Sequence, residues 1–188
     1  MDKFVGNEEQ FKAFIKTFLD LPRHENGLPL RSHFQPMQHT ALLPWFSIAQ
    51  WHDENTLTLR LIGEQIRVIT GGATIGTNMY DLYDEEHTAT FKELHHAAIT
   101  TPFIYKLSRK LTKTDDTVLK SNSYSIPVTS NDGDATFIYT LTHIADTKMM
   151  SLEESTMKKV TLDEMIYLID MGSGIPAPLP FEASIEEL

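Results

Sequence analysis

Three prolines constrain the first part of the chain more than any other feature. Pro29, Pro36 and Pro44 exclude a continuous helix here, because proline lacks a backbone N–H and disfavours helical backbone in the residue before it. Strand-like runs follow at 45–51 and 56–62, separated by turn residues. We expect an extended segment, a strand pair, a short helix and then a glycine turn. This pattern describes a scaffold and contains no catalytic motif.

An amphipathic helix is predicted at residues 7–20. Asn7 suits its N-cap, and apolar side chains recur on one face at spacings of three and four. These side chains are Phe11, Phe14, Ile15, Phe18 and Leu19. We expect the stripe to pack on the sheet of the same chain or on a partner subunit. A membrane-surface helix is the alternative, but acidic residues beside Lys12 and Lys16 remove the basic character that such helices need.

The middle of the chain predicts one long helix followed by three strands. Residues 85–99 form the helix, with Asp84 as its N-cap and acidic residues in its first turn. Alternating patterns at 103–111, 118–128 and 135–145 predict strands joined by turn-forming residues. We therefore expect an α+β fold: a five-stranded antiparallel sheet, short helices and one long helix on one face, and an N-terminal amphipathic helix.

The last part of the chain allows two interpretations. Capping-box patterns that begin at Ser151 and Thr161 favour helix, whereas 165–169 fits a strand equally well. Residues 172–180 are expected to be irregular because glycine and proline dominate them. The acidic tail 181–188 is expected to fray.

Several short motifs occur in an order that resembles a known family. The motifs are Leu28-Pro29-x-Arg31-Ser32, Pro36-Met37, Leu42-Leu43-Pro44, Leu59-Arg60-Leu61-Ile62-Gly63 and Leu168-Ile169-Asp170-Met171-Gly172-Ser173-Gly174-Ile175-Pro176. Together they resemble the PAS-type domain family common in alphaproteobacteria, whose standalone members have poorly defined functions. The chain departs from that family at His33, Gln35 and Ala73-Thr74, where acidic residues are usual.

The resemblance covers residues 25–146 together with the closing motif. We accordingly divide the chain into an N-terminal helix and linker (1–24), a PAS-like domain (25–148) and a C-terminal extension with an irregular tail (149–188). PAS domains have the same order of elements, so the strand and helix pattern and the resemblance agree by separate routes.

Composition excludes several classes of function. A net charge of −10 disfavours nucleic acid and anionic membrane surfaces as partners. The absence of cysteine excludes disulfides, thiol catalysis, a cysteinyl flavin adduct and a thioester-linked chromophore. The N-terminal residues lack the apolar core of a signal peptide, and no apolar run suggests a membrane span. We therefore expect a cytoplasmic protein.

Tyrosines and a few other residues suggest a pocket. In a PAS-like fold, the segment around residues 80–95 and the concave sheet face surround the ligand cavity. Arg60 is a candidate anchor for a carboxylate or phosphate. The other predicted ligand-binding residues are Tyr80, Tyr83, Phe91, His95, Tyr105 and Tyr139. The alternative is that these aromatic residues simply fill the core while Arg60 extends into solvent.

Histidines on the long helix raise two further hypotheses. By resemblance to haem-binding PAS domains, His95 or His96 would be the iron ligand, but no second axial or distal pattern supports haem, and the cofactor stays unassigned. His87 and His95 are two turns apart, too far for a helical zinc pair, so we assign no metal ligand. A small enzyme using a histidine–acid pair is the other hypothesis, although no catalytic residue can be named.

The sequence therefore favours a sensory or regulatory domain over an enzyme. The resemblance implies a small-molecule ligand and signalling through protein contacts. We expect a homodimer formed through the N-terminal helix, or a separate protein partner. A ligand-free interaction module with a filled core is the remaining alternative.

Overall fold

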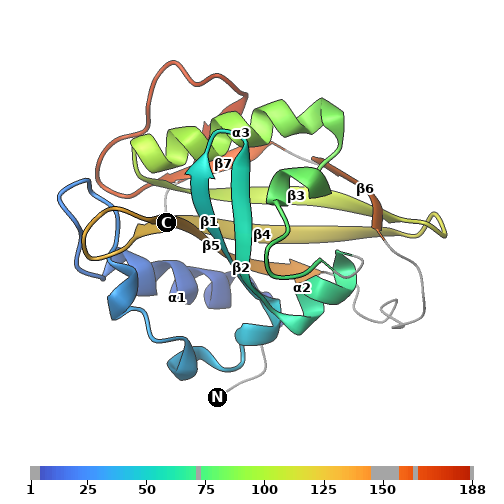
Figure 1. The fold of residues 1–188 in the computed structure, drawn as a ribbon, viewed down its shortest axis with the longest axis horizontal. Coiled ribbons are helices and arrows are strands. Elements are labelled where there is room, and N and C mark those ends of the chain that lie inside the picture. Colours follow the sequence, from blue (N-terminus) through green and yellow to red (C-terminus); the bar gives the residue numbers. More distant parts are fainter. Residues whose placement is uncertain (1–4, 71–72, 145–156, 163–164, 187–188) are drawn as a thin grey trace.

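A single large sheet forms the centre of the chain (Figure 1). The computed structural model describes residues 5–70, 73–144, 157–162 and 165–186. Within them the sheet has eight strands in the order β2-β1-β5-β4-β3-β7-β8, and β6 pairs with β3 beside β7. The strands are β1 (Phe46–Asp53), β2 (Thr56–Ile62), β3 (Phe103–Lys113), β4 (Val118–Thr129), β5 (Thr136–Ile144), β6 (Met157–Leu162), β7 (Ile166–Asp170) and β8 (Ala183–Ile185).

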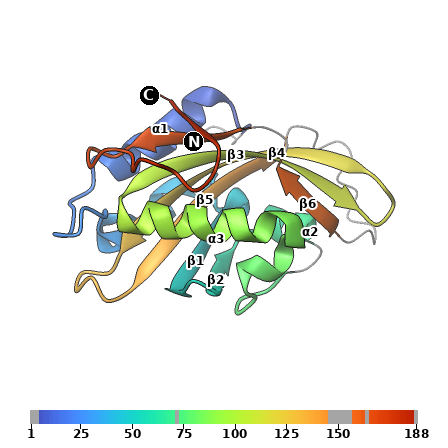
Figure 2. The ribbon, with the colours of Figure 1, turned by 90° about the horizontal axis from the view of Figure 1, so that it is seen from above.

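Helices lie on both sides of this sheet. The α-helices are α1 (Glu8–Leu19), α2 (Glu64–Ile69) and α3 (Glu85–Thr100). Short 3₁₀ turns are η1 (Arg31–His33), η2 (Pro36–His39), η3 (Leu43–Trp45) and η4 (Met79–Leu82). Figure 2 shows α1 on one side of β3, β4 and β5 and α3 on the other. None of the helices in the described part of the chain has the length and apolarity needed to cross a membrane.

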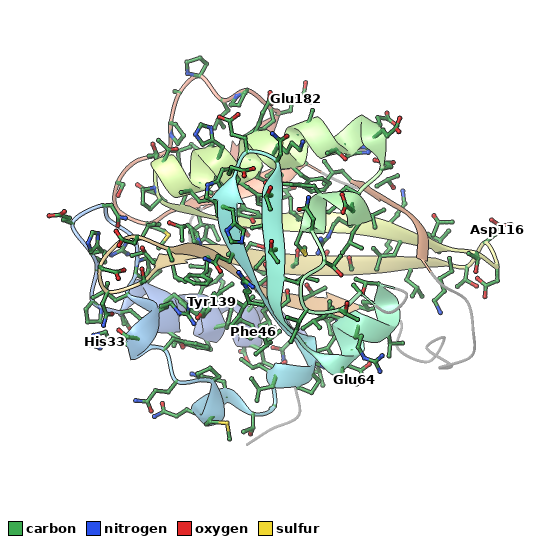
Figure 3. All side chains as sticks on the ribbon, in the orientation of Figure 1. His33, Phe46, Glu64, Asp116, Tyr139 and Glu182 are labelled. Carbon is green, nitrogen blue, oxygen red and sulfur yellow. The ribbon has the colours of Figure 1, made fainter. Side chains whose placement is uncertain are left out.

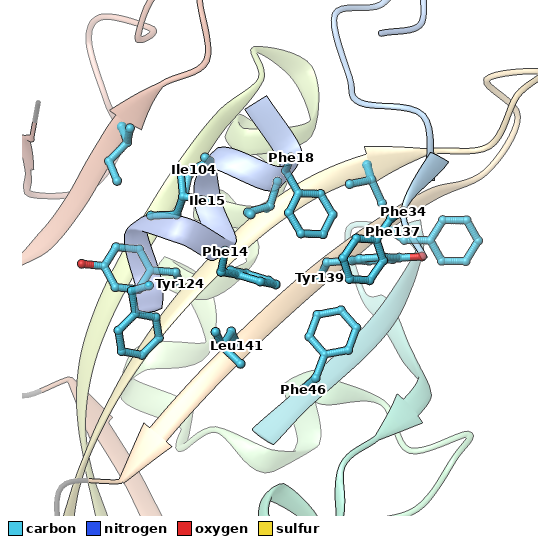
Figure 4. Packing of buried hydrophobic residues seen from close by; sticks show 14 of the residues in the cluster. Phe14, Ile15, Phe18, Phe34, Phe46, Ile104, Tyr124, Phe137, Tyr139 and Leu141 are labelled. Atoms are coloured by element: carbon cyan, nitrogen blue, oxygen red, sulfur yellow. The ribbon is translucent and has the colours of Figure 1, made fainter. Parts of the chain in front are cut away.

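The face under α1 is covered by the predicted amphipathic helix. Asn7 caps α1, because its side chain accepts a hydrogen bond of 2.9 Å from the Gln10 backbone N–H. The apolar stripe is buried against the sheet in an aromatic cluster (Figure 4). Members of this cluster include Phe11, Phe14, Ile15, Phe18, Phe34, Phe46, Tyr124 and Tyr139. The stripe therefore packs within the chain, and its buried side chains are not available for contact with a second subunit.

The opposite face is covered by α3. Asp84 caps this helix by accepting a hydrogen bond of 3.1 Å from the His87 backbone N–H. The buried residues here include Leu57, Leu59, Tyr80, Phe91, Leu94, Ala98, Tyr105 and Leu107. Because successive strand residues point to opposite faces, β3 and β5 contribute to both clusters, whereas β4 contributes apolar residues to the α1 cluster only.

The sheet differs from the predicted one in its size and in one pairing. The expectation of five strands was wrong, because β6, β7 and β8 extend the sheet beyond β3. The last pair, β7–β8, is parallel. The described residues of the C-terminal extension, 157–162 and 165–186, thus continue the sheet, and the tail is not wholly irregular, since Ala183–Ile185 pairs with β7. Of the two predicted capping boxes, the one at Thr161 falls at the end of β6, and the one at Ser151 lies outside the described residues.

A β-bulge in β2 changes which residues face α3. Ile48 pairs with Leu61 but the next residue, Ala49, pairs with Leu59, so Arg60 is the extra residue. Regular strand alternation predicts that Leu57, Leu59 and Leu61 share one face. The bulge instead turns Leu61 towards the α1 cluster, while Leu59 stays in the α3 cluster.

Candidate functional site

A cavity of about 60 Å³ lies on the α3 face of the sheet, beneath α2 and η4. Its walls come from two kinds of surface. Strands supply a floor of small hydroxyl side chains, and the end of β2 and the segments that follow it supply an apolar roof. The floor residues are Ser47, Ser121, Thr140 and Thr142. The roof residues are Ile62, Ile66, Met79 and Leu82.

Strand alternation places the hydroxyl groups on the floor. Ser121, Ser123 and Ser125 occupy alternate positions of β4 and are all buried. On β5, Thr140 and Thr142 follow the same alternation and line the cavity. Small side chains at the middle of a sheet leave space that the covering segments above do not fill, and this is the physical origin of the cavity.

Arg109 is the charged residue of the cavity wall. It lies on β3, directly opposite Ser121 in the β3–β4 pairing. Its Nη2 donates a hydrogen bond of 2.8 Å to Ser123 Oγ. Among the described residues, neither Arg109 Nε nor Ser121 Oγ has a hydrogen-bond partner, although both atoms are buried. Such atoms are uncommon in folded proteins and call for an explanation.

Tyr83 connects the cavity to α3. Its side chain lines the cavity, and its ring stacks on Phe91 with centroids 3.7 Å apart. Burial raises the pKa of Tyr83, and the neighbouring Arg109 guanidinium opposes that rise. The phenol is therefore neutral at physiological pH.

The structure brings together five of the seven predicted ligand-binding residues. Tyr80, Tyr83, Phe91, His95 and Tyr105 form one aromatic group between α3 and the sheet. Of the seven, all of which the structure describes, Tyr83 alone lines the cavity. The other four pack beside it. Any part that they play in binding a ligand stays a prediction.

His95 is a neutral core histidine. Its side chain is 3% exposed, and its Nδ1 lies 3.2 Å from the Tyr80 hydroxyl. Burial, assisted by the positive charge of Arg109, lowers the pKa of His95 to about 3. His96, the other residue considered for haem, is exposed and stacks against Trp51. Neither histidine is among the residues that line the cavity.

The histidine–acid pair that an enzyme would need lies elsewhere. His87 Nδ1 is 2.7 Å from Asp84 Oδ1 at the start of α3, where Asp84 also caps the helix. Glu86 is close to this pair. The pair is outside the cavity, so the described residues do not combine a cavity-facing histidine with a carboxylate.

Arg60 and Tyr139 are not at the cavity. Arg60 is exposed, and its Nε donates a hydrogen bond of 2.8 Å to Gln50 Oε1. Tyr139 lies on the α1 face, as Figures 3 and 4 show, and its ring contacts Phe18 and Phe34. Tyr139 faces α1 because its neighbour on β5, Ile138, faces α3, and successive strand residues point to opposite faces.

Sequence reasoning missed Arg109 and the serines. The signal was present in the alternation of Ser121, Ser123 and Ser125, which are interleaved with the residues of the other face. A second signal was Arg109 on the adjacent strand, which alternates with the apolar residues Leu107 and Leu111. The arginine that lines the cavity is Arg109 on β3, and Arg60 on β2 does not line it.

Comparison with known proteins identifies the family. A family model described as PAS domain matches residues 10–141, from the first turns of α1 into β5. The chain belongs to the PAS domain family. This PAS domain therefore has a sensory or regulatory role in the general sense of its family. The match includes Arg109 and the floor residues Ser47, Ser121 and Thr140, whereas Thr142 and the strands β6, β7 and β8 lie beyond it. No curated protein matches the chain.

Proposed function

We propose that this PAS domain binds a small molecule in the cavity beneath α2 and η4, and that binding changes its contacts with other proteins. The observation that carries the proposal is the pair of buried, unpartnered atoms at the cavity among the described residues, Arg109 Nε and Ser121 Oγ. A buried polar atom without a partner costs free energy. A ligand with polar atoms at this point would remove that cost and so bind favourably.

Tyr83 could transmit a change at the cavity to α3. A ligand that touches the Tyr83 ring also acts on the Phe91 ring stacked against it, and hence on α3. Ligand binding shifts the conformation only if the ligand has different affinities for the two states. The helix α1 lies on the other face of the sheet, so a signal from α3 to α1 has to pass through the strands.

Homodimerisation through the N-terminal helix stays part of the proposal in an altered form. Four residues of the α1 stripe are buried in the chain itself, so a dimer would use the polar side of α1, which carries Lys12 and Lys16. Sedimentation velocity of the wild-type protein and a Lys12→Glu, Lys16→Glu variant tests this. A dimer in both proteins would place the contact elsewhere.

The decisive experiment is native mass spectrometry, with an absorption spectrum, on protein purified from its native host. We expect a co-purifying small molecule in wild-type protein and its loss in Ser121→Leu, which fills part of the cavity. The exposed Arg60→Gln variant is the control and should retain the molecule. Equal occupancy in Ser121→Leu would contradict binding in this cavity, and protein without any bound molecule would favour an interaction module.

A further inference from the structure

We propose that the cavity selects a short-chain monocarboxylate, with its charged end at Arg109 and its alkyl end against the apolar roof. This inference rests on the proposed function and specifies the class of ligand. Three observations carry it: the charge of the wall, the paired unpartnered atoms, and the size and polarity of the space.

Arg109 brings a positive charge that no acidic residue of the cavity wall balances. Arginine stays protonated at all physiological pH values. The chain has 26 acidic residues against 16 basic ones, yet none of the described residues lining the cavity is acidic. The Arg109 contacts in the described chain are to hydroxyl groups, those of Ser123 and Tyr83. An anion is the ligand that such a wall favours.

Arg109 and Ser121 present their unpartnered atoms from directly paired positions. The two residues are Cα partners across β3 and β4. Arg109 Nε has one N–H to donate, and the Ser121 hydroxyl can also donate. A carboxylate has two oxygens and accepts from both donors, and a hydrogen bond from an ionised donor is stronger than a neutral one. Ser123 holds the guanidinium in place by accepting from Nη2.

The size and the roof of the cavity favour a carboxylate over phosphate. A space of about 60 Å³ holds on the order of four to six water molecules, and so a ligand with about that number of non-hydrogen atoms. Ile66 of α2, Leu82 of η4 and Val160 of β6 line it with hydrocarbon. Phosphate carries charge on every side and would face these groups. A three- or four-carbon acid presents an alkyl end to them instead.

The test uses three probes on the full chain: butyrate, its neutral analogue butyramide, and inorganic phosphate. Calorimetry measures affinity, and proton–nitrogen NMR follows the arginine Nε–H signals. We expect butyrate to bind at least tenfold more tightly than butyramide or phosphate and to shift the Arg109 signal. The Arg109→Gln variant should bind butyrate at least tenfold more weakly, because a charge-assisted hydrogen bond is lost. The matched control, Arg60→Gln, should bind it unchanged.

Different outcomes overturn different parts. Butyramide binding as tightly as butyrate would refute the carboxylate while leaving a ligand-binding cavity intact. Tighter binding of phosphate would refute the alkyl end. No binding of any probe, with a larger molecule found by native mass spectrometry, would refute the inference alone, and an empty protein would refute the proposed function as well. If Arg109→Gln does not fold, Ser121→Ala serves instead, and unchanged butyrate affinity in that variant would contradict the proposal.

Discussion

Two serines on β4 provide a matched test of the cavity in the absence of ligand. Ser121 and Ser123 are each 1% exposed and face the same side of the sheet. They differ in one respect. The Ser123 hydroxyl accepts a hydrogen bond from Arg109 Nη2, whereas Ser121 Oγ has no partner among the described residues. We therefore expect alanine substitutions at these two positions to change stability in opposite directions.

The magnitudes follow from the cost of an unpaired buried polar group. Ser121→Ala removes such a group, so the free energy of unfolding should rise by about 1 kcal/mol. Ser123→Ala creates one, because Arg109 Nη2 loses its acceptor, and should lower the free energy of unfolding by about 1 to 3 kcal/mol. In a domain of this size, each kcal/mol corresponds to about 2–4 °C in Tm.

Urea unfolding followed by circular dichroism measures both values on ligand-free protein. The slope of the free energy against urea should match the wild type, so that the midpoint alone reports stability. Equal losses of stability in the two variants would refute the reasoning, because Ser121 Oγ would then be shown to have a partner such as ordered water. Ser121→Ala would gain stability yet lose butyrate affinity, which is the pattern expected of a binding residue rather than a structural one.

Three further predictions concern the rest of the domain. Phe18→Ala should lower the free energy of unfolding by about 3–5 kcal/mol, because Phe18 is fully buried among aromatic rings. The control, Lys16→Ala at an exposed position of the same helix, should change it by no more than about 0.5 kcal/mol. Equal effects of the two substitutions in urea unfolding would contradict the packing of α1 on its own sheet. The pKa of His95 is about 3 when folded and near 6.5 when unfolded, so the unfolded state binds the extra proton as pH falls, and about 2 kcal/mol of stability should be lost between pH 7 and pH 5. His95→Asn should lack that share of the pH dependence in urea titrations, and an unchanged pH profile would show that His95 is not buried neutral. Gly63→Ala should destabilise the protein by about 2 kcal/mol or more, since a Cβ there would overlap the carbonyl oxygens of Leu43 and Pro44; a thermal unfolding midpoint equal to that of the wild type would refute this close approach.

The elements of the domain follow from local patterns in the sequence. The spacing of Phe11, Phe14, Ile15 and Phe18 defines α1, and Asp84 marks the start of α3. Alternation and turn residues define the meander β3-β4-β5 to within about two residues of its observed bounds. These signals are readable because helix and strand periodicities depend only on neighbours along the chain. The strands after residue 156 were harder to predict, since their patterns are short and fit helix equally well.

The site itself was decided by tertiary structure. Sequence predicted an aromatic group and one anchoring arginine, but Arg60 is exposed, the extra residue in β2 turned Leu61 to the α1 face, and the register of β5 placed Tyr139 on that same face. Which face a strand residue occupies depends on its pairing partners and on bulges, because one inserted residue reverses every side chain beyond it. The sequence by itself therefore determined the order of most helices and strands and a resemblance to PAS domains, because these depend on local patterns. Only the pairing of β3 with β4 decided that Arg109 and Ser121 are the residues that meet at the cavity.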